Sequence, residues 1–223
     1  MPMIPTTRKG LSTRRNILQA ASRVFARLGY VETRMIDVAI ESGISTGGLY
    51  RYFDNKTDLF AAVVADIHEE FFELSGHTRH ILVDDPLAAL TEANRGYIEH
   101  YYKNRDVMRA FIEAAAIEKQ FAIILRTMRN RHVKRFAAAY NALRGRGEVL
   151  GVPVEVATEA MSCMIEHCCY VWFAQEGDCE TVVSPQQAIE ITSRAWYATM
   201  FASRAPKNLL DAGEFDRTTK DRS

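Results

Sequence analysis

The sequence predicts an all-α protein in which a small helical unit at the N-terminus precedes a larger helical bundle. Apolar residues recur at helical spacing along most of the 223 residues, and no segment alternates apolar and polar residues as a half-buried strand does. Glycine and proline fall between the periodic segments, where they end one helix or open the next. With 48% hydrophobic residues, the chain can bury a substantial core as one or two domains.

Three short segments predict the N-terminal unit. A helix that follows a Ser12-Thr13 cap ends at Gly29 and carries its apolar residues on one side. The hydroxyl of Thr33 is placed to cap a second helix, which Gly43 ends in a left-handed conformation. Ser45 is placed to cap a third. Two short helices around a glycine-containing turn have the layout of a helix-turn-helix, a motif that reads DNA.

Longer helices are predicted after this unit. Asp54 or Asn55 can cap a fourth helix over residues 59–72, which would join the N-terminal unit to the bundle. Proline and glycine then divide the chain into helices near residues 86–103, 105–116 and 118–144, a turn region over 145–151, and two last helices, from Pro153 to about 176 and from Pro185 to about 203.

The third helix of the N-terminal unit presents two different faces. On a 3.6-residue period, Leu49 and Phe53 lie one turn apart on one face. Gly47, Tyr50 and Arg51 gather on another. The first face can pack against the core, which leaves the second free to contact a partner.

The residue types on that second face suit DNA. Gly47 and Gly48 cost roughly 1 kcal/mol each relative to Ala in a helix, a cost that makes sense if the first turn must approach a nucleic acid closely. The hydroxyls of Tyr50 and Tyr52 suit phosphate oxygens, and the guanidinium of Arg51 suits either a phosphate or a guanine. A solvated helical hairpin without a nucleic-acid partner is the alternative interpretation.

Charge is distributed unevenly along the chain. The whole chain has no formal net charge, but residues 1–60 contain nine basic and five acidic residues, a balance of +4, which leaves −4 for the remainder. A basic N-terminal part is the electrostatic footprint expected where a protein meets phosphates. Residues 1–11, which carry Arg8 and Lys9, are expected to form a flexible basic arm or an ordinary frayed terminus.

A run of residues agrees in order and spacing with a known pattern: Thr33, Val38-Ala39, Gly43-Ile44-Ser45, Gly47, Leu49-Tyr50, Tyr52-Phe53 and Lys56. Through these positions the chain resembles the tetracycline-repressor (TetR) family over about residues 12–60. The resemblance implies a repressor that binds double-stranded operator DNA and leaves it when a small-molecule effector binds.

The same resemblance implies phosphate contacts for Thr33, Tyr50 and Lys56. Arg34 departs from the second Thr that often follows Thr33 in the family. The complete set of residues expected to contact DNA is Arg14, Thr33, Arg34, Ser45, Thr46, Gly47, Gly48, Tyr50, Arg51, Tyr52 and Lys56.

The expected organisation has four parts: a basic arm over residues 1–11, a helix-turn-helix DNA-binding domain over 12–58, an effector-binding and dimerisation domain over 59–205, and a polar tail over 206–223. Because palindromic operators mirror two-fold proteins, a homodimer is expected. The last two long helices carry more apolar residues than one face requires, and in TetR-like proteins the corresponding pair forms a four-helix interface with its copy. A role confined to the core of the monomer is the alternative.

Aromatic and polarisable residues in the bundle are candidates to line an effector cavity. Each of them taken singly is also explained by packing in the core. Together they favour a largely apolar or aromatic ligand. They are Tyr97, Tyr101, Phe111, Phe121, Met128, His167 and Trp172.

The cysteines favour neither a disulfide framework nor a metal centre. Cys163, Cys168, Cys169 and Cys179 all lie in the C-terminal third and form no C-x-x-C pair. Buried thiols are expected, and a thiol-based sensor or a site around His167 and Cys168 is the alternative. We therefore expect no metal and no cofactor.

Motifs of common enzymes are missing from the sequence. It has no phosphate-cradling Gly loop, no Gly-x-Ser-x-Gly elbow and no His-Glu-x-x-His pair. Glu166 and His167 could form an acid-base couple, but adjacent helical residues point about 100° apart. No enzyme and no catalytic residue is expected, and a small-molecule-binding helical protein or enzyme without specific DNA binding is the alternative.

The sequence gives no sign of a membrane segment. No apolar run reaches the roughly 20 residues that cross a bilayer, and the N-terminus lacks the apolar region of a secretory signal. We therefore expect no membrane association and a cytoplasmic location.

Overall fold

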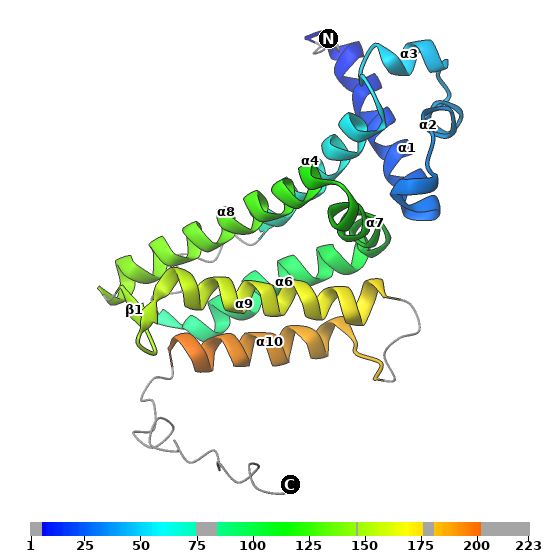
Figure 1. Ribbon diagram of the computed structural model, residues 1–223. Helices are drawn as coiled ribbons and strands as arrows, with labels where there is room; N and C mark the ends of the chain where they lie inside the picture. The colour runs from blue at the N-terminus through cyan, green and yellow to red at the C-terminus, as the bar shows by residue number, and fades with distance from the viewer. Residues whose placement is uncertain (1–5, 75–83, 146, 176–180, 202–223) are drawn as a thin grey trace, which may run out of the picture.

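The computed structural model describes residues 6–74, 84–145, 147–175 and 181–201. Almost all of them are helical, which confirms the expected all-α fold. Figure 1 shows two parts: an N-terminal lobe formed by α1, α2 and α3, and a larger helical bundle formed by α6 to α10, with α4 running from one to the other. The expected polar tail over 206–223 and Cys179 lie outside the described residues.

The first helix of the N-terminal lobe, α1 (Arg8–Glu32), starts earlier than expected. Thr7 is its N-cap, and the Thr7 hydroxyl accepts the Gly10 N–H at 3.1 Å. Arg8 and Lys9 therefore lie in the first turn of a helix, which corrects the Ser12-Thr13 cap and excludes a flexible arm at residues 8–11. Residues 1–5 of the expected arm lie outside the described residues. Gly29, with φ 71° and ψ 178°, interrupts α1 where the sequence places the end of the helix.

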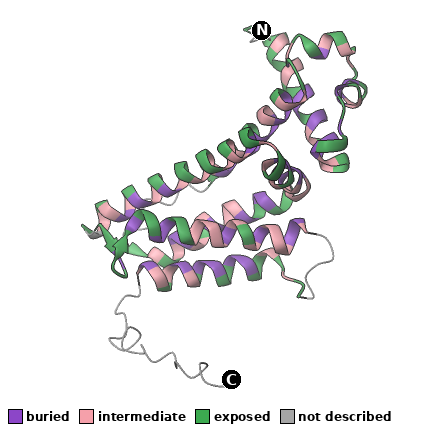
Figure 2. Ribbon diagram, in the orientation of Figure 1, coloured by how far each residue is buried: buried purple, intermediate pink, exposed green. Residues whose placement is uncertain are grey.

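Two short helices complete the N-terminal lobe. They are α2 (Met35–Ser42) and α3 (Thr46–Tyr50). Fully buried side chains from α1 and α3, including Phe25 and Leu49, form the core of the lobe. Figure 2 shows that the buried residues lie where the helices face one another.

The connecting helix, α4 (Lys56–Leu74), starts at the cap that the sequence offers. The side-chain oxygen of Asn55 accepts the Asp58 N–H at 2.8 Å, so Asn55 rather than Asp54 caps the helix. Near its other end α4 crosses α6 very closely. A Cβ atom added to Gly96 would lie 3.2 Å from the Leu74 carbonyl oxygen, so only glycine fits this crossing without a shift.

The bundle helices agree with the expected boundaries within a few residues. They are α6 (Pro86–Lys103), α7 (Arg105–Ile117), α8 (Lys119–Arg144), α9 (Val154–Cys169) and α10 (Pro185–Met200). In the bundle, α6 packs against α10 and α8 packs against α9. Because α7 packs extensively against α1, the bundle is in direct contact with the N-terminal lobe.

Two local features of the bundle differ from the expectation. The turn region contains a short hairpin of two strands, each two residues long: β1 (Glu148–Val149) pairs antiparallel with β2 (Val152–Pro153). No strand was predicted there. The predicted helix to about residue 176 is α9 followed by the π-helical turn η1 (Tyr170–Ala174). A π-helical turn holds more residues than an α-helical one, so it rotates the faces that follow.

Candidate DNA-reading surface and ligand cavity

The turn before the short helix α3 is fixed by two caps: one ends α2 and the other begins α3. Gly43 adopts a left-handed conformation (φ 69°, ψ 27°) that ends α2, and its N–H bonds to carbonyls of the preceding turn. The Ser45 hydroxyl accepts the Gly48 N–H at 3.1 Å. Leu49 is fully buried and Phe53 is 4% exposed, so the inner face of α3 is anchored in the core of the N-terminal lobe.

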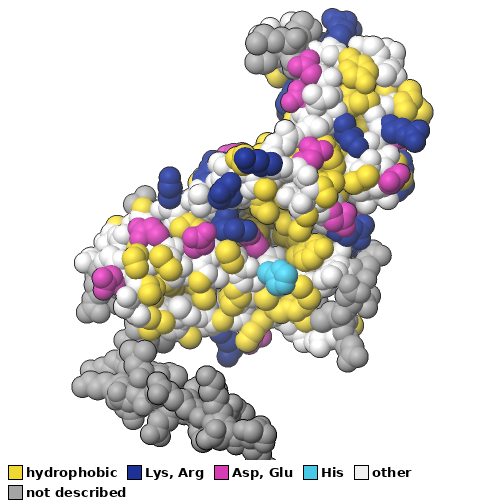
Figure 3. Space-filling view, viewed as in Figure 1, with side chains coloured by type: hydrophobic (Ala, Val, Ile, Leu, Met, Phe, Trp, Pro, Cys, Tyr) yellow, Lys and Arg dark blue, Asp and Glu magenta, His cyan; other side chains and the backbone are white. Residues whose placement is uncertain are grey.

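The opposite face of α3 is open to solvent. Ser45, Gly47, Tyr50 and Arg51 are exposed, and Tyr50 keeps 48% of its surface accessible. Nothing lies within 4 Å of a Cβ atom added to Gly47. Figure 3 shows several Lys and Arg side chains on the same lobe. This face combines a glycine without a side chain, a phenol and a guanidinium, which suits contact with phosphates and base edges.

Other residues of the expected set flank this face. Arg34 is exposed and is the N-cap of α2, and its backbone N–H donates to Asp37 at 2.8 Å. The Arg14 guanidinium lies over the Phe53 ring, 5.3 Å from the ring centre. Three further residues of the set, Thr46, Gly48 and Tyr52, are half-buried, and Tyr52 packs against the core.

Thr33 differs from the expectation. It is 1% exposed, and its hydroxyl donates to the Gly29 carbonyl at 2.6 Å instead of capping α2. The cap is Arg34, and the first helical residue is Met35. The predicted cap at Thr33 is therefore wrong, and in this conformation its side chain has no surface to offer to DNA. Thr33 instead closes the end of α1.

Lys56 is engaged within the protein. Its ammonium donates to the carbonyls of Tyr30 and Val31 at 2.8 and 2.9 Å, and it lies 4.6 Å from the centre of the Tyr30 ring. It thus joins the last turn of α1 to the first residue of α4. An ammonium has three N–H donors, so one remains for a phosphate after both carbonyls are bound.

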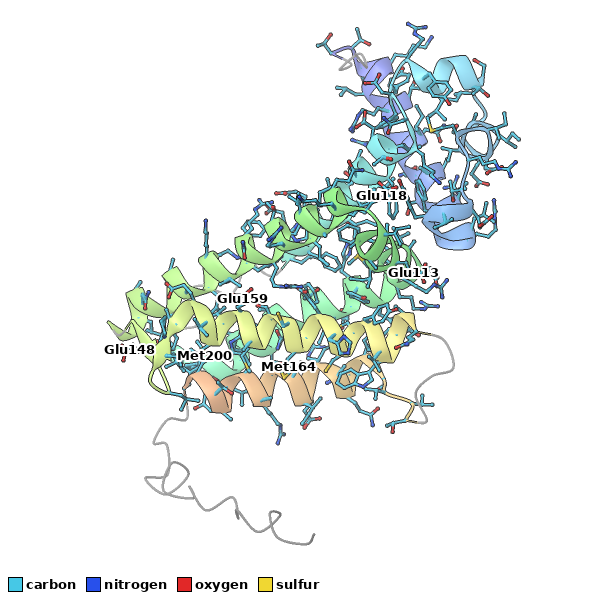
Figure 4. The ribbon with its side chains drawn as sticks, in the orientation of Figure 1. Glu113, Glu118, Glu148, Glu159, Met164 and Met200 are labelled. Carbon is cyan, nitrogen blue, oxygen red and sulfur yellow. The ribbon has the colours of Figure 1, made fainter. Side chains whose placement is uncertain are left out.

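A second contact between the N-terminal lobe and the bundle centres on Tyr30. Its hydroxyl donates to Glu118 at 2.6 Å and lies 2.9 Å from the Thr57 hydroxyl. Burial, together with the bond to Glu118, raises the pKa of Tyr30 to about 12, so the hydroxyl keeps its proton. Figure 4 labels Glu118 at the corner between α7 and α8, next to the N-terminal lobe.

An aromatic cluster surrounds this contact and extends into the bundle. The Phe60 ring on α4 lies 4.3 Å from Phe25 and 5.3 Å from Phe121, and it also contacts Tyr30 and Phe111. The cluster therefore connects α1, α4, α7 and α8 in one packed unit. Sequence reasoning missed the bond between Tyr30 and Glu118, because the two residues are 88 positions apart and neither belongs to a motif.

The bundle contains a cavity between α4, α6, α7, α8 and α9. Four of the expected ligand contacts, Tyr97, Tyr101, Phe111 and Met128, line it. The free space among the side chains is about 30 Å³, room for about two water molecules. The complete lining is Val64, His68, Phe71, Tyr97, Tyr101, Met108, Phe111, Ile112, Leu125, Met128, Arg129, His132 and Glu166.

Three expected ligand contacts lie outside this cavity. Phe121 is fully buried in the aromatic cluster beside Phe60 and Tyr30. His167 is exposed on the outer side of α9. Trp172 belongs to the π-helical turn and lies against Phe173. His167 also points away from its neighbour Glu166, which lines the cavity, so the two do not form an acid-base couple.

The polar part of the lining was not predicted. The Arg129 guanidinium donates twice to one Glu166 oxygen, at 2.9 and 2.6 Å. Burial lowers the pKa of His68 to about 4 and that of His132 to about 3, and the cationic Arg131 and Arg135 add to both shifts. At neutral pH both histidines are therefore uncharged.

Two polar atoms of the lining are buried without a hydrogen-bond partner. They are the Tyr101 hydroxyl and Nε2 of His132. Most buried polar atoms in proteins are hydrogen-bonded, so each exception calls for a physical explanation. A bound molecule in the cavity would supply the missing partners.

The cysteines of the described chain remain free thiols. Burial raises the pKa of Cys163, Cys168 and Cys169, which disfavours the thiolate that a redox sensor needs. Within the described residues, no three His, Cys, Asp or Glu side chains are grouped so that they could hold a metal ion. None of the described helices is long and apolar enough to span a bilayer.

Comparison with known proteins supports the assignment of the N-terminal lobe. A family model described as bacterial regulatory proteins of the tetR family matches residues 17–63. The HTH-type transcriptional regulator TtgR of Pseudomonas putida is 31% identical over 85 residues, which are 38% of this chain and 40% of TtgR. AcrR of Shigella flexneri is 23% identical over 156 residues, 69% of this chain and 73% of AcrR. The match to TtgR thus spans about two fifths of that relative's length.

Solved structures share the whole fold. A putative TetR-family transcriptional regulator from Rhodococcus sp. superposes with a TM-score of 0.67 at 22% identity, covering 85% of this chain and 99% of that one. Another, from Mesorhizobium loti, gives a TM-score of 0.67 at 19% identity and covers 86% and 98%. These relatives are described as transcriptional regulators and not as enzymes.

Proposed function

Because this chain belongs to the TetR family by its helix-turn-helix and has that family's fold, we propose that it is a transcriptional repressor. It acts in the cytoplasm as a homodimer on double-stranded operator DNA, and a small, largely apolar or aromatic effector releases it. The observation that carries this proposal is the open face of α3, anchored by Leu49 and presenting Gly47, Tyr50 and Arg51 to solvent.

The roles at the DNA follow from the chemistry of this face. Gly47 allows the backbone of α3 to come close to the groove, because no side chain separates the helix from the DNA. Tyr50 donates its hydroxyl hydrogen to a phosphate oxygen. Arg51 binds a phosphate or the edge of a guanine. Arg34 and Arg14 flank the face and add charge attraction to the backbone.

A second copy of the chain is expected on α9 and α10. Val156 on α9 is 53% exposed and Ile191 on α10 is 57% exposed, although both are apolar. Ala160 is exposed and Met164, which Figure 4 labels on α9, is half-buried. Figure 3 shows hydrophobic side chains gathered over these two helices. A two-fold pairing of this face would place the two α3 helices to meet both halves of a palindromic site.

Helix α4 supplies the route from the effector to the DNA. Val64, His68 and Phe71 line the cavity from one part of α4, and Phe60 joins the aromatic cluster from another. An effector larger than the present free space must displace cavity side chains, among them Phe111, which touches Phe60. Release requires that the effector bind the displaced arrangement more tightly than the present one.

The test is salt-dependent binding of the purified chain to DNA upstream of its own gene, with unrelated DNA as competitor. A repressor should bind tightly, resist the competitor and lose affinity as salt rises. Arg51→Ala should lower the slope of log affinity against log salt by about one if Arg51 meets a phosphate, or lower affinity about fivefold to a hundredfold at one base position if it reads guanine.

Arg126→Ala is the matched control, because Arg126 is exposed on α8, away from α3. It removes the same charge and should leave the binding unchanged. Equal losses in both variants would point to non-specific charge attraction. If no sequence selected from a random pool binds better than unrelated DNA, the repressor proposal is wrong.

A further inference from the structure

Two polar atoms in the lining of the bundle cavity indicate which chemical groups a ligand of this cavity should carry. Tyr101 is 2% exposed, and its hydroxyl has no partner in the described part of the protein. His132 lines the same cavity, and its Nε2 is likewise buried without a partner among the described residues. A phenol such as Tyr101 donates a hydrogen bond, and a neutral imidazole nitrogen can accept one. One hydroxyl group on a ligand could serve both atoms.

Charge in the lining is already balanced. Arg129 and Glu166 neutralise each other through two hydrogen bonds, and the two cavity histidines are uncharged at neutral pH. An anionic ligand would compete with Glu166 for Arg129, and a cationic ligand would compete with Arg129 for Glu166. Either one would leave an unpaired charge in a buried space, which is costly. The lining therefore disfavours both kinds of ion.

The walls of the cavity favour a flat apolar body. The Phe71 and Tyr97 rings stack with centres 4.8 Å apart, and Tyr97 and Tyr101 are 6.2 Å apart. Met108 and Met128 also line the space. Methionine side chains are flexible and polarisable, so they can move aside and pack again on an aromatic ring. They provide the room that the present free space lacks.

We propose that the cavity binds an uncharged aromatic molecule carrying one hydroxyl group, which accepts a hydrogen bond from Tyr101 and donates one to His132. This inference rests on the proposed function in taking the cavity as the effector site. The binding itself, however, is a property of the bundle and needs no DNA.

Equilibrium dialysis of the full chain against probes of one size tests the proposal. The probes are naphthol, its methyl isostere methylnaphthalene, naphthoate and naphthylmethylammonium. Naphthol should bind about tenfold or more tightly than either ion, and several-fold more tightly than methylnaphthalene. A charged probe that binds as tightly as naphthol, or no binding of naphthol at all, would overturn the proposal.

The Tyr101→Phe variant tests the assigned hydrogen bond. It removes only a hydroxyl that has no hydrogen-bond partner among the described residues, so the melting temperature should stay the same or rise slightly. Naphthol should bind about three- to tenfold more weakly to it, and methylnaphthalene should bind as before. Equal losses for both probes would mean that Tyr101 acts through packing, which contradicts the assignment.

Tyr102→Phe is the matched control, because Tyr102 is the next residue, is 42% exposed and does not line the cavity. It should bind both probes as the unchanged chain does. A subsequent measurement of operator binding with and without naphthol separates the two proposals. If naphthol binds as expected and operator affinity stays unchanged, the proposed ligand class is supported and the proposed release from DNA by an effector is wrong.

Discussion

The N-terminal lobe and the cavity of the bundle differ in where their polar groups without a hydrogen-bond partner in the described part of the chain lie: at the surface in the lobe and in the interior in the cavity. In the N-terminal lobe, the Ser45 cap has its partner within the chain, and Tyr50 and Arg51 are exposed to solvent. In the cavity, the Tyr101 hydroxyl and His132 Nε2 are buried without partners among the described residues. Bulk solvent can bond to the first set, whereas the second set needs a molecule inside the cavity as its partner.

If the proposed effector site is right, ligand binding should stabilise the bundle, and the N-terminal lobe should gain no such stabilisation. Each buried polar atom without a partner costs about 1–3 kcal/mol of stability. The bundle carries this cost, and it also contains two uncharged histidines, His68 and His132, whose pKa values burial lowers. We therefore expect ligands and pH to act mainly on the bundle and expect substitutions on α3 to act mainly on DNA affinity.

The largest expected effect is acid destabilisation of the bundle. In the unfolded chain histidine titrates near its ordinary pKa of 6.5, whereas the folded pKa values are about 4 for His68 and about 3 for His132. The unfolded state therefore binds more protons as pH falls below 6.5, and stability is lost. Each histidine should contribute about 2 kcal/mol of loss between about pH 6.5 and about pH 5. Glu166, whose pKa is raised by burial, changes stability in the opposite direction and offsets part of it.

Urea unfolding followed by tryptophan fluorescence measures this loss, because both tryptophans, Trp172 and Trp196, belong to the bundle. His132→Gln should remove about half of the histidine contribution to the acid sensitivity, and His167→Gln, at an exposed position, should leave it unchanged. The N-terminal lobe contains no histidine, so its hydrogen exchange should respond less to the same change of pH. Equal acid sensitivity in the N-terminal lobe and the bundle would show that the buried histidines do not cause the acid destabilisation.

A smaller effect is expected from Gly47→Ala, which should separate stability from binding in the N-terminal lobe. The added methyl group meets nothing within 4 Å, and Ala is favoured over Gly in a helix by about 1 kcal/mol. The melting temperature should therefore rise. Operator affinity should fall about tenfold or more, because the methyl group would stand between α3 and the DNA.

Fluorescence anisotropy with labelled operator DNA checks the binding half of this prediction. Gly147→Ala adds the same methyl group in the turn region of the bundle, where nothing lies within 4 Å either. It should leave operator affinity unchanged. Undiminished binding by Gly47→Ala would show that α3 does not approach DNA through its first turn.

The same contrast explains how much of the structure the sequence predicts. Helix ends at Gly43, Ser45, Pro86 and Pro185 are marked by residues whose conformation or hydrogen bonding is local. The start of α1 was misplaced because Thr7 and Ser12 are both capping types, and only the fold decides between them.

The cavity could be predicted only in part. Aromatic residues such as Tyr97 and Phe111 were found because large apolar side chains on helices must face some interior. Arg129 and Glu166 are 37 positions apart on different helices, so their pairing depends on how α8 and α9 pack. Trp172 was misplaced because a π-helical turn, which the sequence does not signal, changes the direction of its side chain.

The smallest expected effect concerns the contact that joins the two parts. Tyr30→Phe removes the hydroxyl that bonds to Glu118 and lies next to Thr57, and it keeps the ring in its aromatic cluster. Stability to urea should fall by about 1 kcal/mol. Because the pKa of Tyr30 is about 12, the loss should be the same throughout the neutral range. Operator affinity without effector should change little, since α3 is untouched.

The coupling between the parts should change more than either part alone. If the Tyr30 hydroxyl transmits displacement of α7 and α8 to α1, an effector should weaken operator binding less in Tyr30→Phe than in the unchanged chain. Glu118→Ala should have the same effect, and the double variant should add nothing to it, because both substitutions remove one bond. Additive effects would mean that Tyr30 and Glu118 act separately. The route from cavity to DNA would then run through the packing of Phe60 against Phe111 rather than through this hydrogen bond.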